Sequence, residues 1–244
     1  DRFGNPNSAY QFPGGATHAT STTSYINFGD VTYLDGATGA TWDWWMKTDF
    51  DPPDGSGWWS VFRKGGAWIP MQWAQDGAGN EYRGRVNGAG AEFTYPAGAV
   101  ATDGTTWTHF TMVYDGVNLM LYKDGILIKT QAYAQGALVD GASPFMIGAK
   151  ETGFSEAWKG VVDDVRIYNR ALTKQEMMHM GILPNLLAQW TGVGANNHYY
   201  EGVIAAGAAE DGWTYEQAKA IAASKGGYLA TVTSAAEDAW IKTN

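Results

Sequence analysis

The residues of this sequence that could perform acid–base chemistry are acidic side chains that stand apart from one another. Enzymes that hydrolyse glycosidic bonds need two carboxylates facing each other across a cleft, and on a β-strand two residues share a face when they are two positions apart. Asp43 stands alone among tryptophans, Asp49 and Asp51 are followed at once by two prolines that indicate a turn, and Asp163 and Asp164 are adjacent and should point to opposite faces. We therefore predict no paired-carboxylate site and expect the protein not to be an enzyme.

A second chemistry, elimination by a polysaccharide lyase, would need a Tyr or His base beside Arg and an amide side chain. Tyr82, Arg83, Arg85 and Gln72 could be drawn together, with His109 as a further base, so this alternative stays open. We interpret His109 instead as a hydrogen-bonded structural residue. The chain has four His without paired spacing and no Cys, which excludes thiolate sites and argues against a catalytic zinc site.

Aromatic residues are unusually frequent, with 12 Trp, 13 Tyr and 9 Phe among 244 residues. Trp rings beside polar side chains suit sugars, because the apolar face of a sugar stacks on the ring while polar groups bind its hydroxyls. An exposed aromatic surface of this kind usually marks a binding site. The candidate ligand-binding residues are Trp58, Trp59, Trp68, Trp73, Tyr82, Arg83 and Arg85.

The composition excludes several kinds of partner. A net charge of −9 and a pI of about 4.8 disfavour contact with phosphate backbones, so nucleic-acid binding is not expected. No apolar run approaches the roughly 20 residues of a membrane-spanning helix, and the polar opening residues Asp1-Arg2-Phe3-Gly4 do not have the pattern of a signal peptide. Hydrophobic residues make up 45% of the chain and charged residues only 17%, which is typical of a turn-rich β protein with a packed core.

Residues 9 to about 170 are predicted to form short strands separated by Gly, Asp and Pro. Asp124-Gly125 lies between two of these strands and can adopt the positive φ angles of a tight two-residue turn. Because no long helical period interrupts the stretch, we predict a two-sheet antiparallel sandwich. The predicted strands are Ala9–Phe12, Tyr25–Phe28, Thr41–Lys47, Trp58–Lys64, Trp68–Trp73, Tyr82–Val86, Thr106–Tyr114, Asn118–Lys123, Ile126–Gln131, Phe145–Ile147 and Val161–Tyr168.

The remainder of the chain has a different pattern, in which Thr or Ser is followed three residues later by Glu or Gln. Such capping boxes mark the starts of helices. They occur at Thr173, Thr214 and Ser234, and Tyr228–Val232 is predicted to be a strand between the last two helices. The first helix should run from Lys174 to about residue 180. Residues 181–188 are predicted to be a linker, and residues 189–244 an incomplete α+β second domain.

Four segments in the right order resemble the laminin-G-like, concanavalin A-like jelly-roll family in its bacterial form. They are an early strand with its lead-in (Asp1–Phe12), a Trp-bearing strand (Thr41–Lys47), a hairpin (Trp107–Gly125) and a closing strand with its helix (Gly160–Glu176). The resemblance covers most of residues 1–180 and implies a jelly roll for that region. It also places three tryptophans in the core, namely Trp45, Trp107 and Trp158.

The same resemblance implies a structural calcium ion beside the closing strand. Asp163 matches the family's ligand Asp, and we expect it to share a face with Val165 and Ile167 and to point inward. A divalent ion would resolve the cost of burying that carboxylate. A carbonyl such as that of Gly14, in the early turn, would complete the site. Alternatively, Asp163 accepts backbone N–H bonds in a rim turn.

Residues 189–244 resemble the opening of a C-type-lectin-like domain, through Gln189-Trp190, the segment 197–201 and the segment 226–231. Ala222 stands where the animal form has a Cys, which implies a disulfide-free bacterial type. Both ends of the chain look cut, so we expect a piece of a larger multidomain chain.

Together these features predict a secreted protein, extracellular or on the bacterial cell surface, whose function is non-catalytic recognition of a carbohydrate or glycoconjugate, in adhesion or substrate attachment. One alternative is a structural subunit of a surface layer or filament that assembles with neighbouring copies of itself. The other is the polysaccharide-degrading enzyme considered above.

Overall fold

The computed structural model describes residues 1–17, 19–50, 57–76, 79–88, 92–96, 98–139, 141–179, 187–190, 199–201, 214–224 and 227–243. The chain divides into two compact units, Asp1–Leu172 and Thr173–Asn244. Most of the predicted linker over 181–188 lies outside the described residues. In the part of the chain that is described, no helix combines the length and apolar character that a membrane crossing needs.

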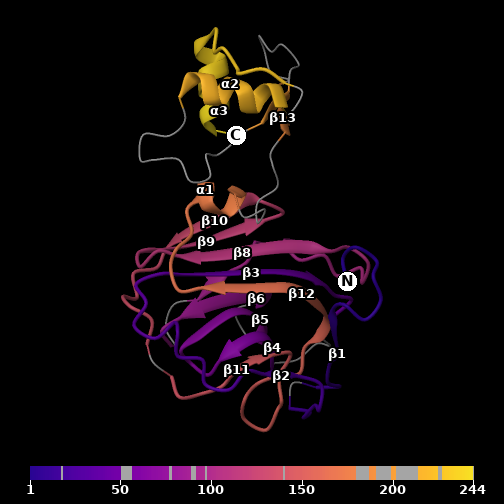
Figure 1. Ribbon diagram of the computed structural model, residues 1–244. Helices are drawn as coiled ribbons and strands as arrows, with labels where there is room; N and C mark the ends of the chain where they lie inside the picture. Colours follow the sequence, from indigo (N-terminus) through magenta and orange to yellow (C-terminus); the bar gives the residue numbers. More distant parts are fainter. Residues whose placement is uncertain are drawn as a thin grey trace. The chain divides into compact units, whose positions relative to one another are not determined.

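Unit 1 is a sandwich of two six-stranded antiparallel sheets, which we call sheet A and sheet B. Figure 1 shows β3, β8 and β12 of sheet A in one layer and β4, β5 and β6 of sheet B in the layer beneath. In order across the sheet, sheet A consists of β1 (Tyr10–Pro13), β12 (Lys159–Tyr168), β3 (Ala40–Lys47), β8 (Thr108–Tyr114), β9 (Asn118–Lys123) and β10 (Ile126–Ala132). Sheet B consists of β2 (Ile26–Asn27), β11 (Phe145–Ile147), β4 (Gly57–Lys64), β5 (Trp68–Asp76), β6 (Gly79–Val86) and β7 (Phe93–Thr94).

The strands predicted over residues 9–170 and the predicted sandwich are confirmed, because each of these strands overlaps a strand of the structure. The turn between β9 and β10 has φ angles of 49° at Asp124 and 83° at Gly125, as a tight two-residue hairpin requires. The sequence did not predict β7, which is only two residues long and too short to show an alternating pattern.

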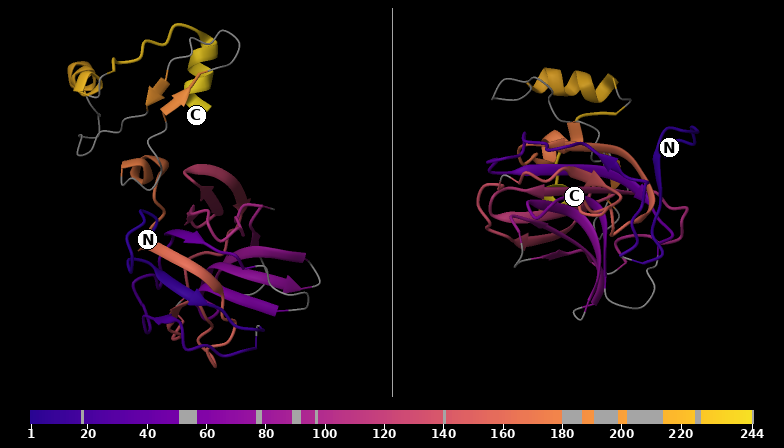
Figure 2. Two further views of the ribbon diagram at one scale, coloured as in Figure 1. Left: turned by 90° about the vertical axis from the view of Figure 1, so that its right-hand side faces the viewer. Right: turned by 90° about the horizontal axis from the view of Figure 1, so that it is seen from below.

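The core lies between the two sheets, and aromatic rings from both fill it. Trp42 and Trp44 alternate with outward residues along β3 and point inward. The ring centroid of Trp42 lies 5.8 Å from that of Trp68, and the centroid of Trp44 lies 5.1 Å from that of Phe62. Figure 2 shows that the strands bend around this core.

Of the three tryptophans expected in the core, only Trp158 is there, with no exposed surface. Placing Trp45 and Trp107 in the core is wrong. Trp45 follows the inward Trp44 and therefore points outward from sheet A, where its ring stacks on His109 at 4.8 Å. Trp107 is half-buried just before β8, and Lys47 Nζ lies 5.1 Å from its ring centroid.

A bulge in β12 changes which way its acidic residues point. Asp163 pairs with Trp45 and Arg166 pairs with Asp43, so the extra residue between these pairs reverses the alternation. Asp163 therefore lies on the outer face of sheet A, and the expectation that it points inward is wrong. Asp164, at φ 48° in the bulge, is not directed away from its neighbour, because both carboxylates accept N–H bonds from Arg2.

Unit 2 contains α1 (Lys174–His179), β13 (Leu187–Gln189), β14 (Tyr199–Glu201), α2 (Tyr215–Ser224) and α3 (Ala235–Thr243). All three helices begin at the predicted capping boxes, whose Thr or Ser hydroxyl accepts the N–H of the third helical residue. Tyr200 binds α3 through its hydroxyl, which lies 2.6 Å from Glu237 Oε1. The prediction of a strand at Tyr228–Val232 is wrong, because this segment forms no strand in the described part of the chain.

Candidate functional site

The outer face of sheet B is a surface of unit 1 on which polar side chains gather from adjacent strands. Ser60 pairs with Gln72, and Gln72 pairs with Arg83, so three strands contribute one row of polar side chains. Their sequence neighbours point into the core, which places this row outside. We call this surface the arginine–glutamate face, and its residues are Trp58, Ser60, Arg63, Gln72, Glu81, Arg83, Arg85, Glu92 and Glu156.

Glu156 is the centre of one hydrogen-bond network on this face. Its Oε2 accepts bonds from Ser60 Oγ at 2.8 Å and from Gln72 Nε2 at 2.8 Å. Arg63 Nη1 donates to the same oxygen at 3.0 Å, and Lys150 Nζ lies 3.2 Å from Oε1. Because these donors satisfy a buried carboxylate from several directions, Glu156 is held in one position and fixes its neighbours.

Arg83 is the centre of a second network. Its Nε donates to Glu81 Oε1 at 2.9 Å, and its Nη1 donates to Glu92 Oε2 at 2.6 Å. Arg85 Nη1 lies 3.6 Å from Glu92 Oε1. The Arg83 guanidinium also lies 5.8 Å from the ring centroid of Trp58, which is within the range of a cation–π contact. The buried Arg83 thus holds two half-buried carboxylates and the half-buried Trp58 ring around it, with Arg85 beside Glu92.

The electrostatics of the arginine–glutamate face are balanced. Each of its carboxylates pairs with at least one cation of the described residues: Glu81 and Glu92 with Arg83, and Glu156 with Arg63. The face thus carries no large local charge. Ser60, Gln72, Arg83 and Glu156 are buried within it, and the half-buried Glu81, Arg85 and Glu92 present carboxylate and guanidinium groups beside the half-buried Trp58 ring. Such a surface can bind hydroxyl groups and stack on the apolar face of a ligand.

Sequence reasoning placed three of the seven candidate residues on this face, namely Trp58, Arg83 and Arg85. The others belong to the inner side of sheet B. Trp59, Trp68 and Tyr82 are core residues with 2%, 0% and 4% of their surface exposed, so assigning them to a surface site is wrong. Trp73 is half-buried and packs edge-on against Tyr82 at 4.8 Å. The reason is the strand alternation, which sends adjacent residues such as Trp58 and Trp59 to opposite faces.

The lyase constellation considered for Tyr82, Arg83, Arg85, Gln72 and His109 does not form. Gln72 and Arg83 are neighbours on the arginine–glutamate face, but Tyr82 lies in the core and His109 lies on sheet A. Burial raises the pKa of the Tyr82 hydroxyl. Trp158 Nε1 donates a bond to this hydroxyl at 3.3 Å, so Tyr82 contributes to core packing.

His109 is a hydrogen-bonded structural residue, as predicted. Its Nε2 lies 2.7 Å from Asp43 Oδ1, and Thr111 Oγ1 donates to the same oxygen at 2.7 Å. Arg166 Nη1 donates to Asp43 Oδ2 at 3.1 Å. Asp43 is fully buried, and these three partners satisfy it on the outer side of sheet A. The Asp43 carboxylate therefore ties β3 to both neighbouring strands.

Asp163 and Gly14, the predicted calcium ligands, do not fit one ion. The β1–β12 ladder runs from Tyr10 opposite Val162 to Pro13 opposite Lys159, so Asp163 lies beyond one end and Gly14 beyond the other. About five residues of extended strand, roughly 16 Å, separate the two positions. Among the described residues, no group of three or more His, Asp or Glu could hold a metal. The oxygens of Asp163 instead accept the N–H groups of Arg2 and Asp164.

Three carboxylates of the arginine–glutamate face were missed by sequence reasoning. Glu81 carries a usable signal, because it stands two and four residues before Arg83 and Arg85 and must share their face on a strand. Glu92 lies just outside β7 and carries no comparable signal. Glu156 comes from a loop with a positive φ of 53°, and only the fold brings it beside Ser60.

Residues 20–178 match the model of the concanavalin A-like lectin/glucanases superfamily, and no curated protein matches the sequence. The fold is similar to that of a "putative carbohydrate binding protein" from Bacteroides ovatus, with a TM-score of 0.54 and 15% identity over 79% of this chain and 50% of that one. It is also similar to a mutant of the NanB sialidase from Streptococcus pneumoniae, with a TM-score of 0.50 and 16% identity over 75% of this chain and 29% of that one. This chain therefore spans about half the length of the Bacteroides protein and less than a third of the sialidase. Identities this low show only that the fold is shared. Because the family model matches more than half of the chain and the two-sheet sandwich agrees with it, the protein belongs to the concanavalin A-like lectin/glucanases superfamily, with a laminin-G-like domain over residues 20–178.

Proposed function

We propose that the protein recognises a carbohydrate through the arginine–glutamate face and catalyses no reaction there. The observation that carries this proposal is the half-buried Trp58 beside Arg83, within a group of ion-paired arginines and glutamates. A sugar ring has apolar C–H faces and hydroxyls that both donate and accept. Trp58 offers a stacking surface, and the half-buried Arg85, Glu81 and Glu92 offer guanidinium donors and carboxylate acceptors.

Two further points support binding without bond cleavage. A glycosidase needs one carboxyl that gives up a proton and a second that acts as nucleophile or base, whereas every carboxylate described on this face is engaged by a cation. In addition, one protein of the same fold is described as a "putative carbohydrate binding protein". Both points favour a binding module.

The proposal includes a location outside the cell or at its surface, where polymeric carbohydrates are met. It also treats residues 189–244 as the opening of a C-type-lectin-like domain. In support, the helices predicted at Thr214 and Ser234 are present as α2 and α3, and the ring centroids of Tyr200 on β14 and Trp240 on α3 lie 5.4 Å apart.

The test is a glycan array with the whole chain, followed by calorimetry with the best neutral oligosaccharide. Replacing Trp58 by Ala should weaken that binding roughly tenfold or more, because the stacked apolar area is lost. The matched control is Tyr10→Ala, which removes an aromatic ring that is 66% exposed on sheet A. Thermal unfolding checks that both variants remain folded.

Equal loss of affinity in the two variants, or none in Trp58→Ala, would overturn the assignment to this face. Binding to no glycan at all would overturn the proposed function and favour the assembly role with neighbouring copies. Release of reducing ends or of unsaturated products from polysaccharides would show that the protein is an enzyme.

A further inference from the structure

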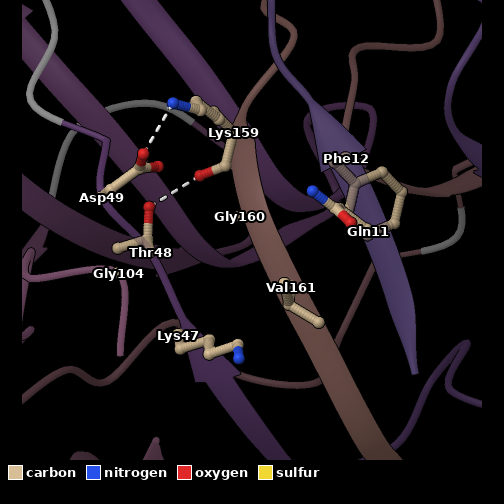
Figure 3. A pocket seen from close by; sticks show the side chains of 9 residues that line it. All are labelled: Gln11, Phe12, Lys47, Thr48, Asp49, Gly104, Lys159, Gly160 and Val161. Carbon is tan, nitrogen blue, oxygen red and sulfur yellow. Dashed lines mark hydrogen bonds and ion pairs between the residues drawn. The ribbon is translucent and has the colours of Figure 1, made fainter. Parts of the chain in front are cut away.

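A pocket lies on the outer face of sheet A, whereas the arginine–glutamate face belongs to sheet B. Gln11 on β1 pairs with Val161 on β12, and Val161 pairs with Lys47 on β3, so the three residues form one row across three strands. Lys159 is two residues from Val161 and shares its face. Figure 3 shows these side chains around the backbone of Gly160. We call this site the lysine pocket; it is lined by Gln11, Lys47, Asp49, Lys159 and Val161, among others.

The charge of the lysine pocket is positive although the chain carries a net charge of −9. Lys159 Nζ binds Asp49 Oδ2 at 2.7 Å, and this bond lowers the pKa of the Asp49 carboxyl. One ammonium and one carboxylate are thus matched. Lys47 forms no ion pair with any carboxylate of the described residues, and its Nζ lies 5.1 Å from the ring centroid of Trp107. Among the described residues, two lysines and one carboxylate therefore line the pocket, and one positive charge remains for a ligand.

The size and lining of the lysine pocket limit what it can hold. Its volume of about 260 Å³ is just below the roughly 300 Å³ at which pockets for drug-sized ligands begin, so it suits one sugar ring or one charged substituent. Val161 is half-buried and gives an apolar floor, and the exposed Gln11 gives an amide donor and acceptor at the rim. Ammonium, amide and apolar floor together match a sugar that bears an anionic group.

We infer that the lysine pocket binds a carboxylate or sulfate group on a sugar ring, with Lys47 as the principal cation. The inference extends the proposed function by adding a second subsite for acidic glycans. Lys47 would meet the anion, Gln11 would bind an adjacent hydroxyl, and the ring would lie on Val161. Because Lys159 is exposed and Lys47 is only half-buried, the binding should weaken as salt is added.

The test is calorimetry of the whole chain with three probes at low salt: a galacturonate trimer, a sulfated galactose trimer and a neutral galactose trimer. Lys47→Met keeps an unbranched side chain that is one atom shorter and removes its charge. We expect it to weaken binding of the acidic probe about tenfold, since a hydrogen bond to a charged group contributes roughly that factor. The matched control is Lys174→Met, which removes the same charge from an exposed residue of α1.

Several outcomes distinguish this site from the arginine–glutamate face. Loss of acidic binding in Lys47→Met, but not in Trp58→Ala or Lys174→Met, supports the lysine pocket, and comparing the two acidic probes shows whether it takes uronates or sulfates. Equal losses in both lysine variants would indicate a general charge effect and overturn the inference. Equal affinity for acidic and neutral trimers would also overturn it, while leaving the proposed function intact. Binding of free sulfate or acetate as tight as that of the acidic trimers would overturn the assignment to a sugar.

Discussion

At the scale of single residues, the structure shows how a β-sandwich stabilises a buried carboxylate on one of its sheets. Asp43 has no exposed surface, yet His109, Thr111 and Arg166 all reach its oxygens. Leaving such a carboxylate without partners would cost several kcal/mol. The three partners come from neighbouring strands on both sides of β3, so this one side chain also fixes how those strands pair.

Replacing Asp43 by Ala should therefore destabilise the fold by about 3 kcal/mol, because it leaves buried donors of His109 and Thr111 without their acceptor. Urea unfolding followed by circular dichroism measures the change. Asp49→Ala is the matched control; its exposed pair with Lys159 should contribute much less. Similar unfolding midpoints for the two variants would contradict the central role of Asp43.

At the scale of elements, turns and bulges decide where strands start and which face each residue takes. The bulge in β12 moves Asp163 to the outer face of sheet A, and register shifts on both sides of Phe62 interrupt the pairing of β4 with β5. Before β8, the carboxylate of Asp103 accepts the N–H groups of Thr105 and Thr106 and both of their hydroxyls. That turn directs the chain into a central strand of sheet A.

The Asp103 turn gives a prediction about pH. The hydrogen bonds from Thr106 and Thr105 lower the pKa of the Asp103 carboxyl. A lowered pKa in the folded state means that the ionised form stabilises the fold above the ordinary Asp pKa, near 4, and that this stability is lost as the pH falls further. Asp103→Ala should lower the unfolding temperature at neutral pH, and the difference from wild type should shrink below about pH 4. A difference that stayed constant across this range would contradict the prediction.

At the scale of the whole molecule, the two outer faces of one sandwich carry different chemistry. The outer face of sheet B carries arginines paired with glutamates beside Trp58. The outer face of sheet A carries the lysine pocket and the buried pair of Asp43 and His109. All of the residues named in these two sites belong to unit 1. Recognition of carbohydrate should therefore not depend on unit 2.

A chain ending at residue 179 tests this directly. It should unfold cooperatively and keep the glycan affinity of the full chain within about twofold, because both sites and the core between the sheets remain. Calorimetry and thermal unfolding of the two chains, side by side, provide the measurement. A large loss of affinity with unchanged stability would mean that unit 2 takes part in binding.

The sequence by itself determined the sandwich, because its strands are set by local alternation, its hairpin by Asp124-Gly125, and its helices by capping boxes that span four residues. It also placed Trp58, Arg83 and Arg85 among the candidate ligand-binding residues. Only the tertiary structure decided which of the neighbouring aromatic residues face solvent. It also decided which carboxylates form ion pairs with the arginines. Glu156 reaches Ser60 and Gln72 from a distant loop, and a bulge reverses the direction of Asp163. The physical reason is that the direction of a side chain on a strand depends on pairing with other strands, and those partners are far away along the chain.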